Sequence, residues 1–100
     1  MREIEKFKID KGYIVYKMSN IDAIGIFNGF GICDDCSSST RVGYYVPVLN
    51  HYMCEDCFNE WQKVCIYYEE DLWFQSGNVK IVDNIINYVR EVKLIDKTKV

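Results

Sequence analysis

Histidine and proline are almost missing from this sequence, which has one of each among its 100 residues, and it has no long apolar run. No uncharged stretch approaches the roughly 18 residues of a membrane-spanning helix. The N-terminal sequence MREIEKFK is charged and lacks the apolar segment of a signal peptide. The single histidine, His51, has no H-x-E pattern around it, which argues against a zinc deaminase. We therefore expect a cytoplasmic protein without a membrane-spanning segment.

Basic residues are scarce in the middle of the chain. Residues 21–78 carry nine Asp and Glu against only Arg41 and Lys63, whereas residues 1–20 and 79–100 each hold five Lys and Arg against three acids. The net charge of −3 therefore combines two basic ends with an acidic centre. Phosphate would be repelled from that centre, which disfavours nucleic acid as a partner. Direct nucleic-acid binding would have to use the lysines of the two ends: Lys6, Lys8, Lys11 and Lys17, or Lys93, Lys97 and Lys99.

Four of the five cysteines form two C-x2-C pairs, Cys33 with Cys36 and Cys54 with Cys57. Each C-x2-C turn places two sulfurs on the same side of the backbone, at a spacing that suits a tetrahedral zinc site. Two disulfides and a rubredoxin-type iron site are the alternatives. Disulfides would leave one thiol over, and iron knuckles usually continue with glycine, whereas serine and phenylalanine follow here. We expect one structural Zn2+ per chain.

A four-cysteine zinc site leaves no coordination position open for a catalytic water. The sequence also shows no nucleophile beside a base, so we expect no enzyme activity. The fifth cysteine, Cys65, shares a predicted helix face with Trp61 and Tyr68. We expect it to be a small buried hydrophobic side chain, with a redox-active thiol as the alternative. A domain this small has a hydrophobic core of marginal stability. A metal that binds only the folded state could add on the order of 10 kcal/mol to its free energy of unfolding.

The apolar pattern predicts an α+β fold in a single zinc-stabilised domain, residues 1–100. Alternating residues and turn signals predict three pairs of strands: 3–10 with 13–18, 23–27 with 30–32, and 43–49 with 51–53. Steps of three and four residues predict two helices: 55–68, and an amphipathic C-terminal helix over 79–95. Between these helices we expect an extended segment at 72–75 and a break at 76–78. The domain would thus comprise N-terminal hairpins at 1–32, a zinc module at 33–68 and the C-terminal helix.

A cysteine turn, a hairpin, and a helix whose first turn carries the second cysteine pair occur in this order in treble-clef zinc fingers. Residues 33–68 resemble that family. The resemblance implies a treble-clef-like fold with Cys33, Cys36, Cys54 and Cys57 as the zinc ligands. Treble clefs serve in nucleic-acid binding, in protein binding and in enzymes, so the resemblance implies no particular activity.

A second resemblance concerns three short sequence segments: GICDDC at 31–36, VPVLN at 46–50 and CEDCFNEW at 54–61. They look like segments of small uncharacterised zinc-binding proteins of gut bacteria and their mobile elements. This resemblance implies no function.

We expect the protein to be a non-catalytic module that binds another protein. The acids between the cysteines would attract a basic partner: Asp34, Asp35, Glu55 and Asp56. The aromatic residues Trp73 and Phe74 would supply apolar contact. Core packing is the alternative for these aromatics, and solubility is the alternative for the acids. A phage or mobile-element inhibitor, whose acidic surface occupies a host nucleic-acid or defence enzyme, is the alternative function. The apolar face of the C-terminal helix could pack on the zinc module or on a second copy, which leaves a homodimer open.

Overall fold

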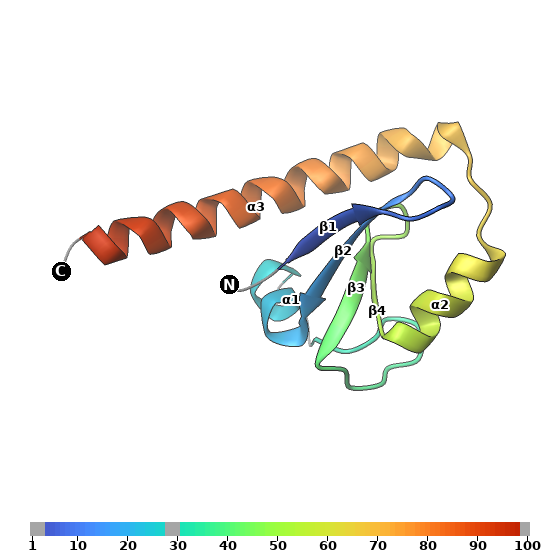
Figure 1. The fold of residues 1–100 in the computed structure, drawn as a ribbon, viewed down its shortest axis with the longest axis horizontal. Helices are drawn as coiled ribbons and strands as arrows, with labels where there is room; N and C mark the ends of the chain where they lie inside the picture. The colour runs from blue at the N-terminus through green and yellow to red at the C-terminus, as the bar shows by residue number, and fades with distance from the viewer. Residues whose placement is uncertain (1–3, 28–30, 99–100) are drawn as a thin grey trace.

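The computed structural model describes residues 4–27 and 31–98, with side chains described up to residue 88. One antiparallel sheet, ordered β1-β2-β3-β4, has helices on both of its faces (Figure 1). The strands are β1 (Glu5–Lys8), β2 (Ile14–Ser19), β3 (Val42–Val46) and β4 (His51–Met53). The helices are α1 (Asn20–Phe27), α2 (Glu55–Val64), the short 3-10 helix η1 (Glu69–Asp71) and α3 (Leu72–Thr98). The α+β class predicted from the sequence is confirmed.

Both faces of the sheet are largely buried along β2, β3 and β4, whereas the residues of β1 are exposed. Tyr16 pairs with Tyr45, and Tyr45 pairs with Tyr52, so the three tyrosines lie in one row across the sheet. Because side chains alternate along a strand, the residues next to them point to the opposite face. These are also buried: Val15, Val46 and Met53.

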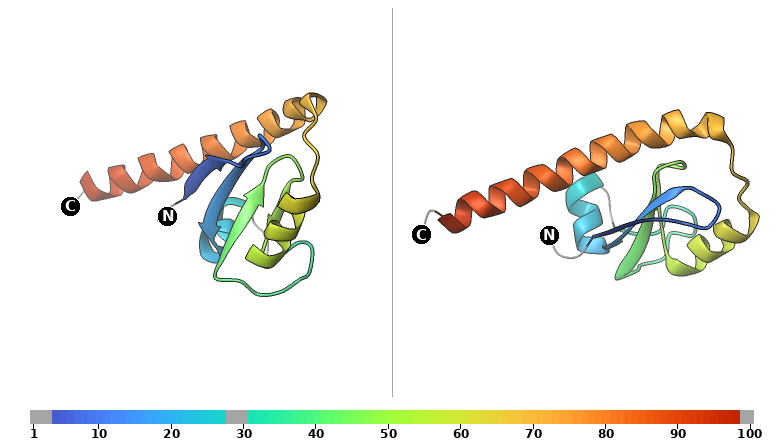
Figure 2. Two further views of the ribbon diagram at one scale, coloured as in Figure 1. Left: turned by 45° about the vertical axis from the view of Figure 1, so that its right-hand side comes forward. Right: turned by 45° about the horizontal axis from the view of Figure 1, so that its top comes forward.

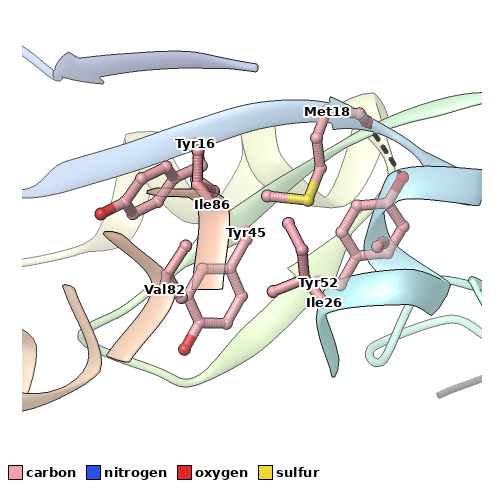
Figure 3. Packing of buried hydrophobic residues seen from close by; sticks show 8 residues of the cluster. Tyr16, Met18, Ile26, Tyr45, Tyr52, Val82 and Ile86 are labelled. Atoms are coloured by element: carbon pink, nitrogen blue, oxygen red, sulfur yellow. Dashed lines mark hydrogen bonds between the residues drawn. The ribbon is translucent and has the colours of Figure 1, made fainter. Parts of the chain in front are cut away.

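Helices α1 and α3 cover the face that carries the three tyrosines (Figure 3). Their buried residues pack with Met18 of β2 in one cluster: Ala23 and Ile26 from α1, and Val82 and Ile86 from α3. The hydroxyl of Tyr52 donates a hydrogen bond to the carbonyl of Met18 at 3.2 Å. This bond gives the buried phenol a partner inside an otherwise apolar cluster.

Helix α2 covers the opposite face, as two further views show (Figure 2). Phe58 of α2 stacks on Tyr44 of β3 with ring centroids 4.1 Å apart. Phe58 also shares a buried cluster with Val15, Met53 and Cys33. The first residue of the first cysteine pair is therefore part of the hydrophobic core on this side of the sheet.

Helix α1 occupies residues for which the sequence pattern predicts a strand. The prediction of a strand at 23–27, the first arm of a hairpin, is therefore wrong. The turn expected at Asn28-Gly29 lies outside the described residues. The hydroxyl of Ser19 accepts a hydrogen bond from the N–H of Asp22 at 3.1 Å, as a helix N-cap does. A Ser-x-x-Asp sequence is a helix-start signal. In this chain the apolar residues after the signal form a helix and not the predicted strand.

Helix α2 ends at Val64, so the prediction of a helix that reaches residue 68 is wrong at its C-terminal end. The ammonium of Lys11, in the turn between β1 and β2, donates to the carbonyls of Lys63 at 3.2 Å and Cys65 at 2.6 Å. Carbonyls at a helix end need partners from outside the helix. A lysine distant in the sequence thus caps α2 earlier than the spacing of its apolar residues indicates.

Helix α3 begins at Leu72 and continues for 27 residues. The predictions of an extended segment at 72–75, a break at 76–78 and a helix confined to 79–95 are therefore wrong. The acids of η1 precede this helix, at the end where the helix dipole stabilises negative charge. Among the described residues, neither this helix nor any other is apolar enough over a sufficient length to cross a bilayer.

Polar residues dock the first turns of α3 on the sheet. The side-chain oxygen of Gln75, which is buried, accepts a hydrogen bond from the N–H of Ile14 at 2.8 Å. The side-chain amide of Asn78 donates to the carbonyl of Pro47 at 2.9 Å. These residues look like a break in the apolar pattern, but their contacts with the sheet favour the helix.

A cluster of three polar residues ties α3 to the strands. Asp83 accepts hydrogen bonds from the hydroxyl of Tyr16 at 2.6 Å and from the ammonium of Lys6 at 2.8 Å. Partial burial acts to raise the pKa of Asp83, but the hydrogen bonds from Lys6 and Tyr16 outweigh it and lower this pKa. Asp83 therefore stays ionised near neutral pH and joins β1, β2 and α3.

Replacing Tyr16 by phenylalanine should lower the free energy of unfolding by about 1 to 3 kcal/mol, because Asp83 loses a charge-assisted hydrogen bond. The same change at Tyr88, which is 67% exposed, should alter it by less than about 0.5 kcal/mol. Urea unfolding of both variants measures the difference. The difference should shrink as the pH falls through the folded-state pKa of Asp83, since its contribution exists only above that pKa. Equal stability of the two variants would contradict this role of the cluster.

Candidate metal centre

The first cysteine pair lies in a tight turn that precedes β3. The carbonyl of Cys33 accepts a hydrogen bond from the N–H of Ser37 at 2.9 Å, and the N–H of Cys33 donates to the carbonyl of Ser38 at 3.0 Å. Ser37 has a φ of 61°, a left-handed conformation that is uncommon for a residue with a side chain. The turn brings the sulfurs of Cys33 and Cys36 to one place.

Asp34 fastens this turn to β4. Its N–H donates to the carbonyl of Tyr52 at 2.7 Å, and its carboxylate accepts a hydrogen bond from the N–H of Tyr52 at 2.8 Å. Because Cys54 follows closely after Tyr52, the two bonds hold the first cysteine pair beside the second. The sequence predicts Asp34 as one of four acids on a partner-binding face, and this stays a prediction, because its side chain is exposed. Its carboxylate also accepts the backbone hydrogen bond and positions the turn.

The second cysteine pair lies at the start of α2. Cys54 follows β4 directly and is the N-cap residue of the helix, and its carbonyl accepts the N–H of Phe58 at 2.9 Å. Cys57 is in the first helical turn. Glu55 and Asp56 lie between the two cysteines and are exposed, at the helix end that favours negative charge.

The two pairs converge. The sulfurs of Cys33, Cys36, Cys54 and Cys57 all lie within 4.8 Å of one another. The sulfurs of Cys36 and Cys54 are 3.7 Å apart, and a tetrahedron with zinc–sulfur bonds of about 2.3 Å has edges of about 3.8 Å. A disulfide needs about 2.05 Å, whereas all five cysteines are free thiols. The four cysteines therefore form a site that could hold one metal ion.

The surroundings shift the pKa values of Cys36 and Cys57 in opposite directions. Hydrogen bonds from the hydroxyl and backbone of Ser38 lower the pKa of Cys36 to about 6. Hydrogen bonds with Cys36 and then with the other two thiols raise the pKa of Cys57 above its usual value. The rise at Cys57 follows from proximity, because sulfurs this close cannot all carry negative charge unless a cation lies between them.

Cys65 and His51 lie outside the group of four. Cys65 is the C-cap residue of α2 and packs against the buried cluster around Phe58, but it is half-buried and not fully buried as the sequence predicts. The Nδ1 atom of His51 is 3.1 Å from the carboxylate of Asp35, but the two groups are not aligned for a hydrogen bond. The contact therefore lacks the hydrogen bond by which a carboxylate orients the imidazole of a catalytic dyad.

A hollow of about 410 Å³ lies beside Cys33, next to α1. Its wall includes three aromatic rings: Phe27, Tyr45 and Tyr52. The hydroxyl of Tyr45 donates to the side-chain oxygen of Asn50 at 2.7 Å, so these two polar groups satisfy each other. Among the described residues that line the hollow, no nucleophile is hydrogen-bonded to a carboxylate or imidazole base.

Trp73 and Phe74 lie at the start of α3 and not beside the cysteines. Trp73 is 77% exposed and Phe74 is 40% exposed, and their rings meet edge to face with centroids 6.0 Å apart. Helix α2, the connecting residues 65–68 and η1 all lie between the second cysteine pair and the start of α3 (Figure 1). The aromatic pair and the acids around the cysteines are therefore on different parts of the molecule.

Comparison with known proteins adds no relative. No family model, no curated protein and no solved structure matches this chain. The role of the site therefore rests on its geometry and chemistry.

Replacing Asp34 by alanine should lower the free energy of unfolding by about 1.5 to 3 kcal/mol, because the N–H of Tyr52 loses a charged acceptor. The matched control is Asp35→Ala, which removes the same charge from an exposed contact and should cost less than about 1 kcal/mol. Urea unfolding at one pH compares the two variants. If Asp34→Ala is no more harmful than Asp35→Ala, Asp34 does not position the turn.

Proposed function

We propose that this chain is a non-catalytic zinc-binding module that binds another protein. The observation that supports the metal is the convergence of four sulfurs from two C-x2-C turns. Cys33, Cys36, Cys54 and Cys57 would hold one Zn2+ as thiolates, in a closed tetrahedral site. The turn, the β3–β4 hairpin and α2 follow one another in the order of a treble-clef zinc finger, and we infer that this part of the chain is one.

The metal would have a structural role. Zinc would join the turn at Cys33, the end of β4 and the first turn of α2, three segments that meet at the edge of one buried cluster. Four thiolates complete the coordination of zinc, so no position remains for a water or a substrate. In a domain of this size, the free energy of zinc binding would be a large part of the free energy of folding.

The purified chain should therefore contain one zinc per molecule, and Cys57→Ala should lose both zinc and fold, a loss on the order of 10 kcal/mol. The matched control, Cys65→Ala, should keep one zinc and cost only about 1 to 3 kcal/mol, as a small truncation in a partly buried place does. Elemental analysis and circular dichroism, with and without a chelator, measure both effects. A chain that holds well under half an equivalent of zinc, and stays folded in chelator, would contradict the metal assignment.

The surface around the metal supports the choice of a protein as the partner. Asp35, Glu55 and Asp56 are exposed beside the four cysteines, and four thiolates around Zn2+ would add a net charge of about −2. Such a face would attract a basic protein surface and repel phosphate. Trp73 would supply apolar contact from the first turn of α3, because exposed ion pairs contribute only about 0 to 1 kcal/mol each.

Once a partner has been isolated by affinity capture with the zinc-loaded chain, Asp56→Lys should slow its association severalfold at low salt and leave its dissociation nearly unchanged. The control is Asp10→Lys, the same charge reversal at an exposed residue of the turn between β1 and β2. Trp73→Ala should mainly speed dissociation, by about tenfold or more. Surface plasmon resonance separates the two rates. Equal association rates for both charge reversals, at every salt concentration, would remove the acidic face from the proposal.

A further inference from the structure

The four cysteines of the candidate metal centre differ in how far solvent reaches them. Cys33 is fully buried in the core. Cys54 and Cys57 are half-buried, whereas Cys36 is exposed. Oxidation of a cysteine depends on access to its sulfur as well as on its thiolate character. All four sulfurs would be thiolates in the proposed zinc site, so a small oxidant dissolved in water would meet the sulfur of Cys36 first.

The sulfur of Cys36 is in direct contact with the sulfur of Cys54, 3.7 Å away. The two residues are 18 positions apart in the chain and belong to different segments, the turn before β3 and the start of α2. A disulfide needs a distance of about 2.05 Å, so the two sulfurs would have to approach each other by less than about 2 Å. Rotation of one side chain about its Cα–Cβ bond covers such a distance.

Cys54 has the freedom to make this movement. It is the N-cap residue of α2, its backbone is extended, and its side chain makes no capping hydrogen bond. The backbone of Cys57 is fixed in the first helical turn. A disulfide with Cys33 would displace a side chain of the packed core, and such cores resist movement. Cys54 is therefore the thiol best placed to react with an oxidised Cys36.

Two hydrogen bonds between Asp34 and Tyr52 keep Cys36 and Cys54 together. They measure 2.7 and 2.8 Å, and they join residues that lie two positions before each of these cysteines. Neither bond involves a sulfur atom, so neither depends on the oxidation state of the cysteines. The turn therefore holds the two thiols in position for a reaction between them.

We propose that Cys36 and Cys54 are a redox pair, in which a hydroperoxide oxidises Cys36 and Cys54 then closes a disulfide with it. In the first step, with hydrogen peroxide, the thiolate of Cys36 attacks one oxygen. A sulfur–oxygen bond forms, the oxygen–oxygen bond breaks, and hydroxide leaves, which gives a sulfenic acid. In the second step the thiolate of Cys54 attacks the sulfur of Cys36. The disulfide forms, the sulfur–oxygen bond breaks, and a second hydroxide leaves. The two sulfurs together lose two electrons, which the peroxide takes up.

This disulfide would regulate the proposed zinc site, and its effect on the metal rests on that proposed function. The two thiols that remain, Cys33 and Cys57, cannot complete a tetrahedral site, so the chain would release zinc. Four thiolates around Zn2+ carry a net charge of about −2, whereas a disulfide and two protonated thiols carry none. The face around the cysteines would therefore lose about two negative charges and attract a basic surface less strongly.

Treating the zinc-loaded chain with about 1 mM hydrogen peroxide should release about one zinc per chain, which a chromophoric zinc indicator measures. Tryptic cleavage after Arg41 separates the two cysteine pairs. After alkylation of the remaining thiols, mass spectrometry should therefore find two peptides joined by a disulfide between Cys36 and Cys54. Cys33 and Cys57 should carry the alkyl group. Dithiothreitol with added zinc should reverse the reaction and restore one zinc per chain.

Two further measurements test the order of the steps and the choice of thiols. Dimedone, which traps sulfenic acids, should label Cys36 during the reaction. The matched variant is Cys65→Ala, which removes the thiol outside the metal centre and should change neither the release of zinc nor the disulfide. A label on another cysteine, or loss of the disulfide in Cys65→Ala, would overturn the assignment.

The outcomes also separate this inference from the metal assignment. A purified chain without zinc would contradict the metal assignment, while the mapping of its oxidised thiols would still test the pair. A chain that holds zinc and keeps it in peroxide, or that releases zinc without a disulfide between Cys36 and Cys54, would overturn the redox pair alone. A disulfide within either C-x2-C turn would overturn it as well.

Discussion

The structure depends on one constraint: the sheet is apolar on both faces, so both must be covered. Tyr16, Tyr45 and Tyr52 line one face and need α1 and α3 above them. Val15 and Met53 line the other and need α2. The chain therefore crosses from one face to the other twice, once before β3 and once between α2 and α3.

The cysteine cluster lies where the first of these crossings meets the start of α2. The turn that carries Cys33 leaves α1 on one side of the sheet and reaches the buried cluster on the other. Asp34 holds it there through two hydrogen bonds to the backbone of Tyr52. The four sulfurs thus come together through hydrogen bonds and packing that the described structure already contains. A bound zinc ion would link the turn at Cys33 to the start of α2 and so stabilise the folded state of a domain with a small core.

Two kinds of surface remain after the sheet is covered, and they differ in chemistry. Around the cysteines the exposed residues are acids, which suit encounter with a basic protein. Along α3 the exposed residues include three apolar side chains, Phe74, Ile81 and Tyr88. The second crossing separates the two surfaces, because residues 65–68 connect the end of α2 to η1.

The sequence by itself determined the features that depend on local spacing. The two C-x2-C turns predicted the group of four cysteines, alternation predicted β2, β3 and β4, and Gly12 marked the turn between β1 and β2. The start of α2 followed from the change to helical spacing after Cys54. Ser19 and Asp22 also carried a local signal for α1, which the apolar residues after them obscured.

Tertiary contacts decided the rest, because the deciding groups come from distant parts of the chain. Lys11 ends α2 by capping its last carbonyls, and Ile14 donates to Gln75 and so fixes the start of α3 within a polar stretch. The carboxylate of Asp34 could not be told from that of Asp35 until β4 was beside it. Nor could spacing alone show which apolar residues of α3 would be buried, since Val82 and Ile81 are neighbours in the sequence and only the position of the sheet separates them. Local patterns set which elements can form, whereas packing over a two-faced sheet decides where they end and which side they bury.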